Sequence, residues 1–478
     1  MILLAMSTNA EHIKYLDVNI FNNGFRHAQV ELTDTEVEWR RSPLPGTAIV
    51  RPMQFGTCTS EIPYYMGVNG DASRFMRDLA DHAKQRLYLE RAMQAGFTSD
   101  PEDIQRAMVH SPFHEGWAFV QEVNPNPSRT AVPIQMYVPV NGTGSTHLER
   151  RVVNMNFQHG FEPGNIAILN PALVCDEHSH ANNIDPTTGW PYQCNRDTHH
   201  GHNPKATRGH TEAIGTAVQG RLPVTLDSMT PLPTALQAYI NEDINKRGIL
   251  ATSVEPLACV FQSHGPLLAK NEVPKSAAFI GDGLNALLIA MFYQLYAPDT
   301  NIVVVGKNPA KLEVIQQVNP QRIRPVVTDG SHDKTSYDDL SYALEEQTGS
   351  RQADVVIPTV ALPESTVSPF VREGGMVVWW AASISETATN KSDKAQKPYR
   401  EFYSYGGAPR AEFSAAAGLD YLVREKPAVL APIESYPGVF YTDMNHGAAN
   451  HIQTWLNKKG RFEHPENGLS SKIVVNMH

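Results

Sequence analysis

The chain has 478 residues, of which 41% are hydrophobic and 19% charged, and this globular composition excludes a disordered, collagenous or coiled-coil protein. Its length predicts two or three domains. The formal net charge of −10 at pH 7 argues against a nucleic-acid or anionic-membrane partner, because either would need clustered lysine and arginine.

The first residues and the cysteines predict a cytoplasmic protein. Residues 1–6 are apolar but have no basic flank and run into Ser-Thr-Asn, which is not the pattern of a signal peptide. Four cysteines are too few for a disulfide framework and indicate a reducing compartment. Residues 276–295 approach the length of a membrane span, but glycines and polar residues interrupt them, so we interpret them as a buried strand, a tight turn and a helix.

The first half of the chain predicts a strand-rich domain with additions. Residues 29–55 contain short β-rich runs. Residues 73–96 carry apolar side chains at helical spacing and predict a helical insertion between strands. Residues 175–212 have no hydrophobic period and are rich in His, Asn, Asp, Gly and Pro, which predicts a long loop.

Beyond Ser253 the pattern alternates between strands and helices. Strands are predicted at 277–280, 301–305, 354–357 and 376–380, and helices at 284–296 and 309–317. Such alternation predicts a parallel sheet with helical crossovers, and therefore an α/β fold class. Residues 472–475 predict one more strand, too far along the chain to complete this unit alone.

A glycine motif lies inside this unit. Residues 281–286 read Gly-Asp-Gly-Leu-Asn-Ala and match G-x-G-x-x-A between a predicted strand and a predicted helix. Glycines at this place let a pyrophosphate approach the backbone at a helix N-terminus, so we predict cofactor contacts from Gly281, Gly283, Leu284 and Asn285. The alternative is a glycine turn that binds no nucleotide.

The end of the next predicted strand bears on cofactor choice. An acidic residue there would bind the adenosine ribose diol, but this chain has Gly306 followed by Lys307. Loss of the carboxylate and gain of a cation suit a 2′-phosphate, so the sequence predicts NADP(H) over NAD(H). A solvated Lys307 without a phosphate role is the alternative.

Several segments together resemble the medium-chain dehydrogenase/reductase superfamily, nearest its sorbitol and threonine dehydrogenase branch. They are residues 45–61, Phe113-His114-Glu115, residues 161–168, Glu255-Pro-Leu-Ala-Cys259, and residues 303–313, 354–357 and 371–378. The resemblance implies a GroES-like catalytic domain over residues 1–255, with insertions at about 69–110, 124–155 and 176–250. It further implies a Rossmann cofactor-binding domain over 256–408, and a segment, 409–478, that returns to the catalytic domain.

The resemblance also implies a catalytic zinc ion. Cys58, His114 and Glu115 would supply thiolate, imidazole and carboxylate ligands, and Glu255 matches a carboxylate that this branch places at the metal as ligand or water partner. Such a zinc polarises an alcohol or carbonyl oxygen. Ser60 stands at the hydroxyl position that relays the substrate proton. The alternative is that Cys58 and His114 are ordinary buried core residues.

Three departures from the family pattern bear on these roles. Pro63 replaces a histidine that passes the proton to solvent in many members, and Phe113 replaces a glycine beside the ligands. The four-cysteine structural zinc lobe is absent. A mixed site of Cys175, His178 and Cys194 is chemically feasible, but its spacing fits no finger pattern, so we prefer a metal-free polar loop.

The sequence therefore predicts a zinc-dependent, NADP(H)-preferring oxidoreductase that interconverts a secondary alcohol and a carbonyl. We expect a small-molecule substrate, no nucleic-acid or membrane partner, and a homodimer or homotetramer. The alternatives are a metal-free reductase or non-redox member of the same fold, and a nucleotide-binding scaffold or sensor without catalysis. We expect the helical insertion at 73–108 to cap the active-site cleft, against the alternative of a packed decoration elsewhere.

Overall fold

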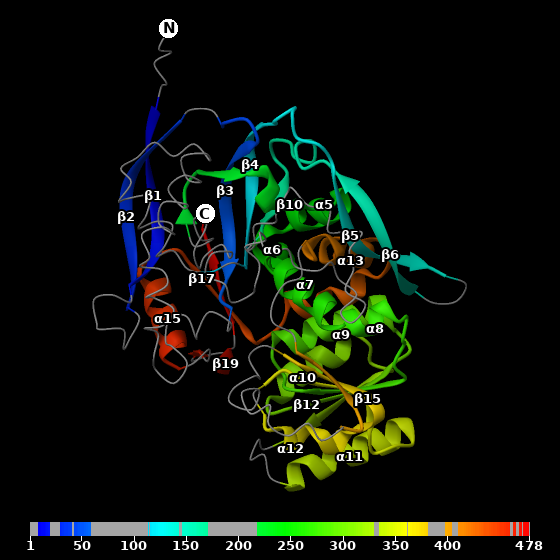
Figure 1. The fold of residues 1–478 in the computed structure, drawn as a ribbon. Helices are drawn as coiled ribbons and strands as arrows, with labels where there is room; N and C mark the ends of the chain where they lie inside the picture. Colours follow the sequence, from blue (N-terminus) through cyan, green and yellow to red (C-terminus); the bar gives the residue numbers. More distant parts are fainter. Residues whose placement is uncertain are drawn as a thin grey trace.

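The computed structural model describes residues 8–19, 29–40, 43–58, 113, 115–142, 146–170, 218–328, 334–360, 362–380, 397–403, 410–458, 462–464, 468–470 and 472–477. The predicted helical insertion at 73–108, the predicted loop at 175–212, and Ser60, Pro63 and His114 lie outside the described residues. Figure 1 shows the strand-rich part of the fold and the parallel sheet with its helices.

The strand-rich part is built on β3 (Thr47–Gly56) and β4 (Glu115–Asn124), which pair antiparallel. They lie within a sheet of order β10-β7-β4-β3-β20-β17, and β9 also pairs with β3. The other members are β7 (Ile166–Leu169), β9 (Leu222–Thr225), β10 (Met229–Pro231), β17 (Val439–Asp443) and β20 (Lys472–Asn476). The strand predicted at 472–475 is thus present, and it lies between β3 and β17.

Three smaller strand groups surround this sheet. The first joins β1 (Thr8–Asn19), β2 (Gln29–Arg40) and β8 (Val218–Gln219), the second is the hairpin of β5 (Val132–Asn141) and β6 (Thr146–Met155), and the third pairs β18 (Phe462–His464) with β19 (Gly468–Ser470). Helix α15 (His446–Asn457) packs on β2, where the amide of Val30 donates to Gln453 Oε1 at 2.7 Å. The β5–β6 hairpin occupies most of the predicted insertion at 124–155.

The second large sheet is entirely parallel, as predicted. Its order is β13-β12-β11-β14-β15-β16. The strands are β11 (Ser276–Ile280), β12 (Asn301–Gly306), β13 (Ile323–Val327), β14 (Ala353–Pro358), β15 (Val371–Trp379) and β16 (Arg400–Tyr403). Numbered within the sheet, this order is 3-2-1-4-5-6, which is that of dinucleotide-binding Rossmann sheets.

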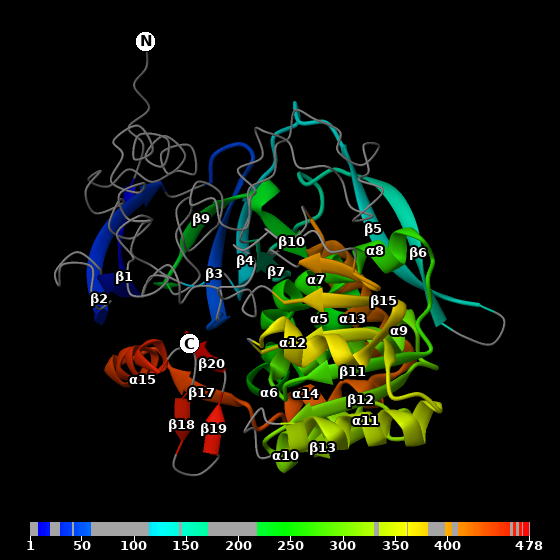
Figure 2. The same ribbon diagram turned by 60° about the horizontal axis from the view of Figure 1, so that its bottom comes forward.

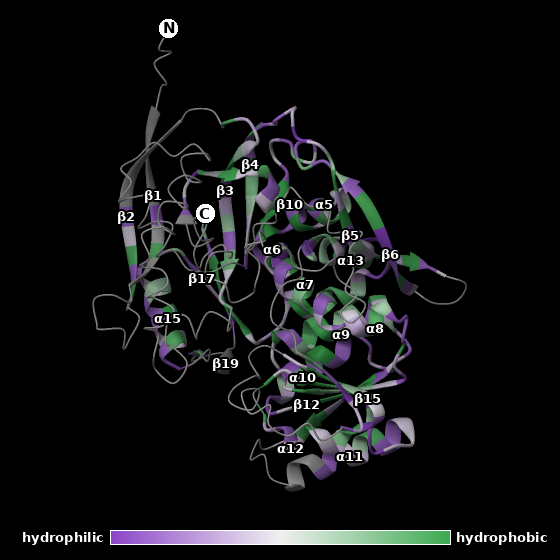
Figure 3. Cartoon of the chain, viewed as in Figure 1, coloured by the Kyte–Doolittle hydropathy of each residue, from purple (hydrophilic) through white to green (hydrophobic). Residues whose placement is uncertain are grey.

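Helices cover both faces of the parallel sheet, as a sheet of this kind requires. The crossovers include α9 (Leu284–Tyr296), α10 (Pro309–Gln317), α11 (Lys334–Thr348) and α12 (Glu364–Val367). Alternate side chains of β11 point to opposite sides, so Phe279 joins the core with α9 whereas Ile280 joins the core with Leu344 of α11. Figure 2 shows the same sheet from below, and Figure 3 shows its hydrophobic strands beside the more polar α11.

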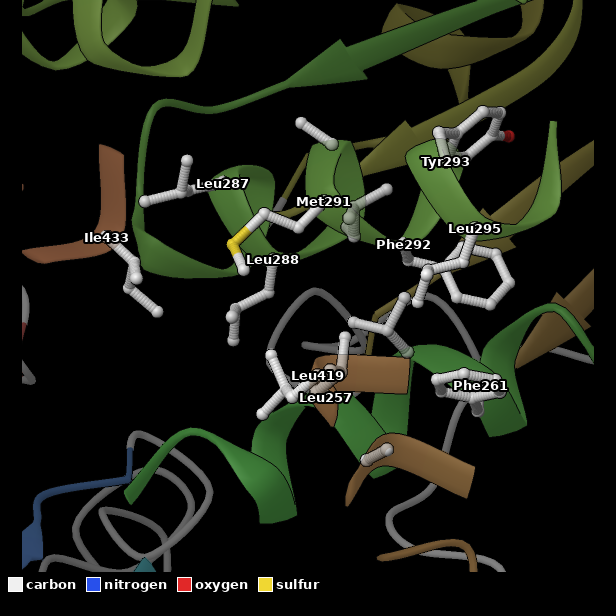
Figure 4. Packing of buried hydrophobic residues seen from close by; sticks show 14 of the residues in the cluster. Leu257, Phe261, Leu287, Leu288, Met291, Phe292, Tyr293, Leu295, Leu419 and Ile433 are labelled. Atoms are coloured by element: carbon white, nitrogen blue, oxygen red, sulfur yellow. The ribbon is translucent and has the colours of Figure 1, made fainter. Parts of the chain in front are cut away.

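A helical layer joins the two sheets. It contains α5 (Thr234–Glu242), α6 (Ile244–Thr252), α7 (Val254–Ser263), α8 (Gly265–Ala269), α13 (Glu412–Glu425) and α14 (Ala431–Glu434). Figure 4 shows side chains of α9 directed toward Leu257, Phe261 and Leu419, which come from α7 and α13. This buried layer fixes α7, which carries Glu255, relative to the glycine turn that precedes α9. No helix in the described ranges is long and apolar enough to cross a membrane.

Candidate active site

The glycine turn follows β11 directly. Gly281 has a φ of 127°, a conformation that favours glycine, and its amide donates to the carbonyl of Val305 at 2.8 Å. A Cβ at Gly281 would collide with Thr359 Oγ1. Position 281 therefore has room for backbone only, and the turn lies at the carboxyl end of the first strand of the parallel sheet, where dinucleotides bind in this fold.

Helix α9 begins immediately after the turn. Its N-cap is Gly283, which has no side chain to bond the first amides, and Leu284 and Asn285 are the first two helical residues. The first amides of a helix have no partner within the helix, and the helix dipole adds partial positive charge at that end. This geometry fits a pyrophosphate, and it supports the roles predicted for Gly281, Gly283, Leu284 and Asn285.

Asp282, between the two glycines, reaches the end of the neighbouring strand. Its Oδ2 accepts hydrogen bonds from the amides of Lys307 and Asn308, each at 2.7 Å, and its own carbonyl accepts one from the hydroxyl of Tyr436. A Cβ at Gly306 would collide with the Cβ of Asp282. Gly306 and Lys307 thus lie where the sequence places them, at the end of β12, but a carboxylate that sequence reasoning missed lies against them.

Acidic groups cluster around Cys259, which is half-buried. Cys58 follows β3, and Glu255 lies in the first turn of α7 with Cys259 one turn later, 3.5 Å from Sγ to Glu255 Oε1. Burial raises the pKa of the Cys259 thiol, and the nearby charges of Glu255, Cys58 and Glu412 raise it further. Two of the predicted metal residues, Cys58 and Glu255, thus both lie near enough to Cys259 to influence its thiol.

Glu412 is a member of this cluster that sequence reasoning missed. It begins α13, more than 150 residues after Glu255 by the numbering, and it is 3% exposed. Burial raises its pKa to about 7, and the charge of Glu255 adds to the shift. The spacing of Glu255 and Cys259 could have indicated a shared helix face, whereas nothing local to residue 412 indicates its place.

Glu115 has a cationic partner. Its carboxylate forms an ion pair with the Lys472 ammonium of β20, and the two residues are 3% and 5% exposed. A Cβ at Gly56 would collide with the Lys472 side chain, so the glycine that ends β3 provides the space for this lysine. The charge of Glu115, predicted as a metal ligand, is thus balanced within the protein.

No protein-family model and no curated protein sequence matches the chain. Solved structures do match over nearly its whole length. The 2R,3R-butanediol dehydrogenase of Bacillus subtilis is 14% identical, with 97% of this chain and 99% of that chain covered and a TM-score of 0.54. An E. coli alcohol dehydrogenase complexed with NADH is 12% identical, with 97% and 99% covered and a TM-score of 0.54. The L-idonate 5-dehydrogenase of E. coli is 14% identical, with 98% and 99% covered and a TM-score of 0.52.

The chain has the fold of a medium-chain dehydrogenase/reductase. This confirms the fold class expected from the sequence, with a GroES-like part and a Rossmann sheet. The backbone of Phe113 has a φ of 75°, in the left-handed region that favours glycine. In this protein the Phe113 ring is buried and stacks on Phe55, with ring centroids 5.1 Å apart.

The described residues alone do not complete a metal site. Among them, no three histidine, cysteine or carboxylate side chains gather closely enough to hold a metal ion. Of the predicted residues, Cys58, Glu115 and Glu255 are described, whereas His114, Ser60 and the loop residues Cys175, His178 and Cys194 lie outside the described ranges.

Proposed function

We propose that the protein is an oxidoreductase that interconverts a secondary alcohol and a carbonyl compound by hydride transfer to and from a nicotinamide dinucleotide. The observation that carries this proposal is the glycine turn at residues 281–283, where Gly281 has no space for a Cβ; it joins the first strand of a 3-2-1-4-5-6 sheet to the uncapped N-terminus of α9. Dinucleotides bind at this switch point of the sheet. The fold neighbour from E. coli, solved with NADH, supports the same cofactor class.

We further infer that Cys58, Glu255 and His114 bind a zinc ion. Thiolate, imidazole and carboxylate form a ligand set that zinc accepts, with one position open for substrate. When bound, the zinc would polarise the alcohol or carbonyl oxygen. Cys58 and Glu255 both raise the pKa of the Cys259 thiol, which supports the proximity of Cys58 to Glu255.

The remaining residues of the site have supporting roles in this proposal. The Lys472 ammonium holds Glu115 beside the ligands, at the start of β4, so that this carboxylate orients the site. Ser60 would relay the hydroxyl proton of the substrate, passing its own proton to solvent as it takes up that of the substrate. Pro63 leaves this relay without the histidine that follows in many members of the family.

The test combines metal analysis with a hydride-transfer assay. Protein purified without chelator should contain about one zinc per chain, and it should oxidise some member of a panel of secondary alcohols and polyols with a nicotinamide cofactor. The Cys58→Ala and His114→Ala variants should lose zinc and turnover but retain cofactor binding, since the glycine turn lies on the other sheet.

Cys175→Ala and Cys194→Ala are the matched controls, because each also removes one thiol and should retain zinc. Zinc that survives loss of Cys58 and His114 but not of Cys175 would place the metal in the 175–212 segment. Turnover by wild-type protein without metal would favour the metal-free reductase. Cofactor binding without turnover on any substrate of the panel would favour the scaffold or sensor.

A further inference from the structure

We propose that Asp282 determines the cofactor specificity of this site and directs it to NAD(H). The inference rests on the proposed function, because it concerns the nicotinamide dinucleotide at the turn of residues 281–283. It departs from the prediction of NADP(H), which considered only Gly306 and Lys307. The structure adds the position of a third side chain at the same place.

The adenosine ribose is expected near the end of β12. In a Rossmann sheet the pyrophosphate binds at the first strand–helix turn, and the ribose hydroxyls lie over the end of the second strand, which commonly provides an acidic residue for them. Here β12 ends at Gly306 and provides none. The carboxylate of Asp282 occupies this location instead, bonded to the amides of the two residues that follow β12. The glycine turn thus supplies the acidic group that the second strand lacks.

The space beside Gly306 is already filled. A glycine at this position could leave room for a 2′-phosphate, which is how the sequence favoured NADP(H). In the structure, the space that a Cβ would take contains the Cβ and carboxylate of Asp282. Gly306 is therefore explained by the close approach of Asp282, and its presence no longer indicates a phosphate.

The hydrogen bonding and charge of the Asp282 carboxylate also favour NAD(H). Oδ2 of Asp282 accepts both amide hydrogen bonds, and among the described residues no group donates to Oδ1. Oδ1 can accept a hydrogen bond from a ribose hydroxyl, as NAD(H) offers. A 2′-phosphate would instead bring two negative charges toward a carboxylate and compete with it for the same two amides. The Lys307 side chain is exposed, so solvent screens its attraction for a phosphate.

The experiment measures dissociation constants for NADH and NADPH by titration of the full-length protein without substrate. Wild-type protein should bind NADH more tightly. Asp282→Asn keeps an oxygen that can accept both amides but removes the charge, and it should shift the affinity ratio toward NADPH by about 10- to 100-fold. Glu313→Gln, an exposed carboxylate on α10, removes the same charge away from the turn and should leave the ratio unchanged.

Thermal unfolding of each variant checks its folding, and Asp282→Ser serves if the Asn variant fails to fold. Equal weakening of both cofactors would mean that Asp282 only braces the turn, and it would overturn the inference. Tighter NADPH binding by the wild type would also overturn it, and so would an unchanged ratio in Asp282→Asn. These outcomes leave the proposed function standing, whereas failure of the wild type to bind either cofactor would overturn the proposed function and this inference with it.

Discussion

Glu115 and Lys472 form a buried ion pair between strands that lie on opposite sides of β3. Their Cα positions are 357 residues apart in the numbering, and each belongs to a strand whose core side chains are fully buried. A buried charge requires its partner, because the energy lost on leaving water is recovered only through the pair. The pair therefore couples the start of β4 to the last described strand.

We expect Lys472→Met to destabilise the protein by about 3 to 5 kcal/mol, because it leaves the Glu115 carboxylate buried without this cation. The double variant Glu115→Gln/Lys472→Met should recover a large part of that loss, since no uncompensated charge remains. Denaturant unfolding of the single and double variants measures both values. A loss below about 1 kcal/mol in the single variant, typical of a surface pair, would contradict this account.

We expect the folded protein to lose stability in acid because His264 is buried. The side chain is buried against Phe292, Tyr293 and Tyr296, and burial lowers its pKa from 6.5 to about 4. The unfolded chain takes up a proton below pH 6.5 and the folded chain does not until about pH 4. The stabilising contribution is thus present above pH 6.5 and is lost as the pH falls to 4, by about 3 kcal/mol.

The His264→Phe variant should remove this part of the pH dependence, because it replaces the imidazole with a benzene ring, which cannot take up a proton. Unfolding free energies measured between pH 7 and pH 4 test the prediction. His159→Asn, which changes an exposed histidine, is the control and should follow the wild type. A variant curve parallel to that of the wild type would show that His264 does not contribute.

Gly281→Ala should abolish cofactor binding and destabilise the protein by at least about 2 kcal/mol, because the new methyl group would meet Thr359 and the backbone is in a region that favours glycine. Gly349→Ala is the matched control, since Gly349 also has a positive φ, of 76°, but has open space around it. It should cost only about 1 kcal/mol and leave cofactor affinity unchanged. Titration with cofactor and thermal unfolding distinguish the two variants.

The predicted lid at 73–108 stays a prediction, and the structure adds the position of its attachment. Gly56 pairs with Glu115 across β3 and β4, so the chain leaves and re-enters the sheet at one point beside Cys58. We expect replacement of residues 72–108 by a short Gly/Ser linker to retain zinc and cofactor binding but to change the Michaelis constant and the substrate preference. A folded, zinc-loaded variant with both unchanged would contradict the lid.

Features with a local signal could be predicted from the sequence. The sequence predicts helices at 284–296 and 309–317 with the bounds that the structure gives, and in the structure Asn308 caps the second. The strand–turn–helix around Gly281 follows from the same kind of signal. The neighbouring Asp282 could not be assigned a role, because the motif leaves this position unspecified. The direction of the Asp282 side chain depends on the space beside Gly306, which belongs to another strand.

A single sequence gives no signal for contacts between residues that are far apart along the chain. The partner of Glu115 and the place of Glu412 depend on how β20 and α13 return to the strand-rich part. Glu255 was recognised by resemblance, but the helix that carries it was not predicted, so the contact with Cys259 one turn later was missed. Burial of these charges is a property of the assembled core, and short patterns do not report it.

The central position of β20 affects how the chain can fold during synthesis. Ile473, Val474 and Val475 are fully buried, and until they have been made β3 has an open edge where β20 will pair. The sheet that carries Cys58 and Glu115 therefore cannot close on a growing chain, although the parallel sheet, complete by residue 403, can form earlier. An open edge pairs readily with other chains, so the nascent protein should depend on chaperones and aggregate when translation stops before residue 472.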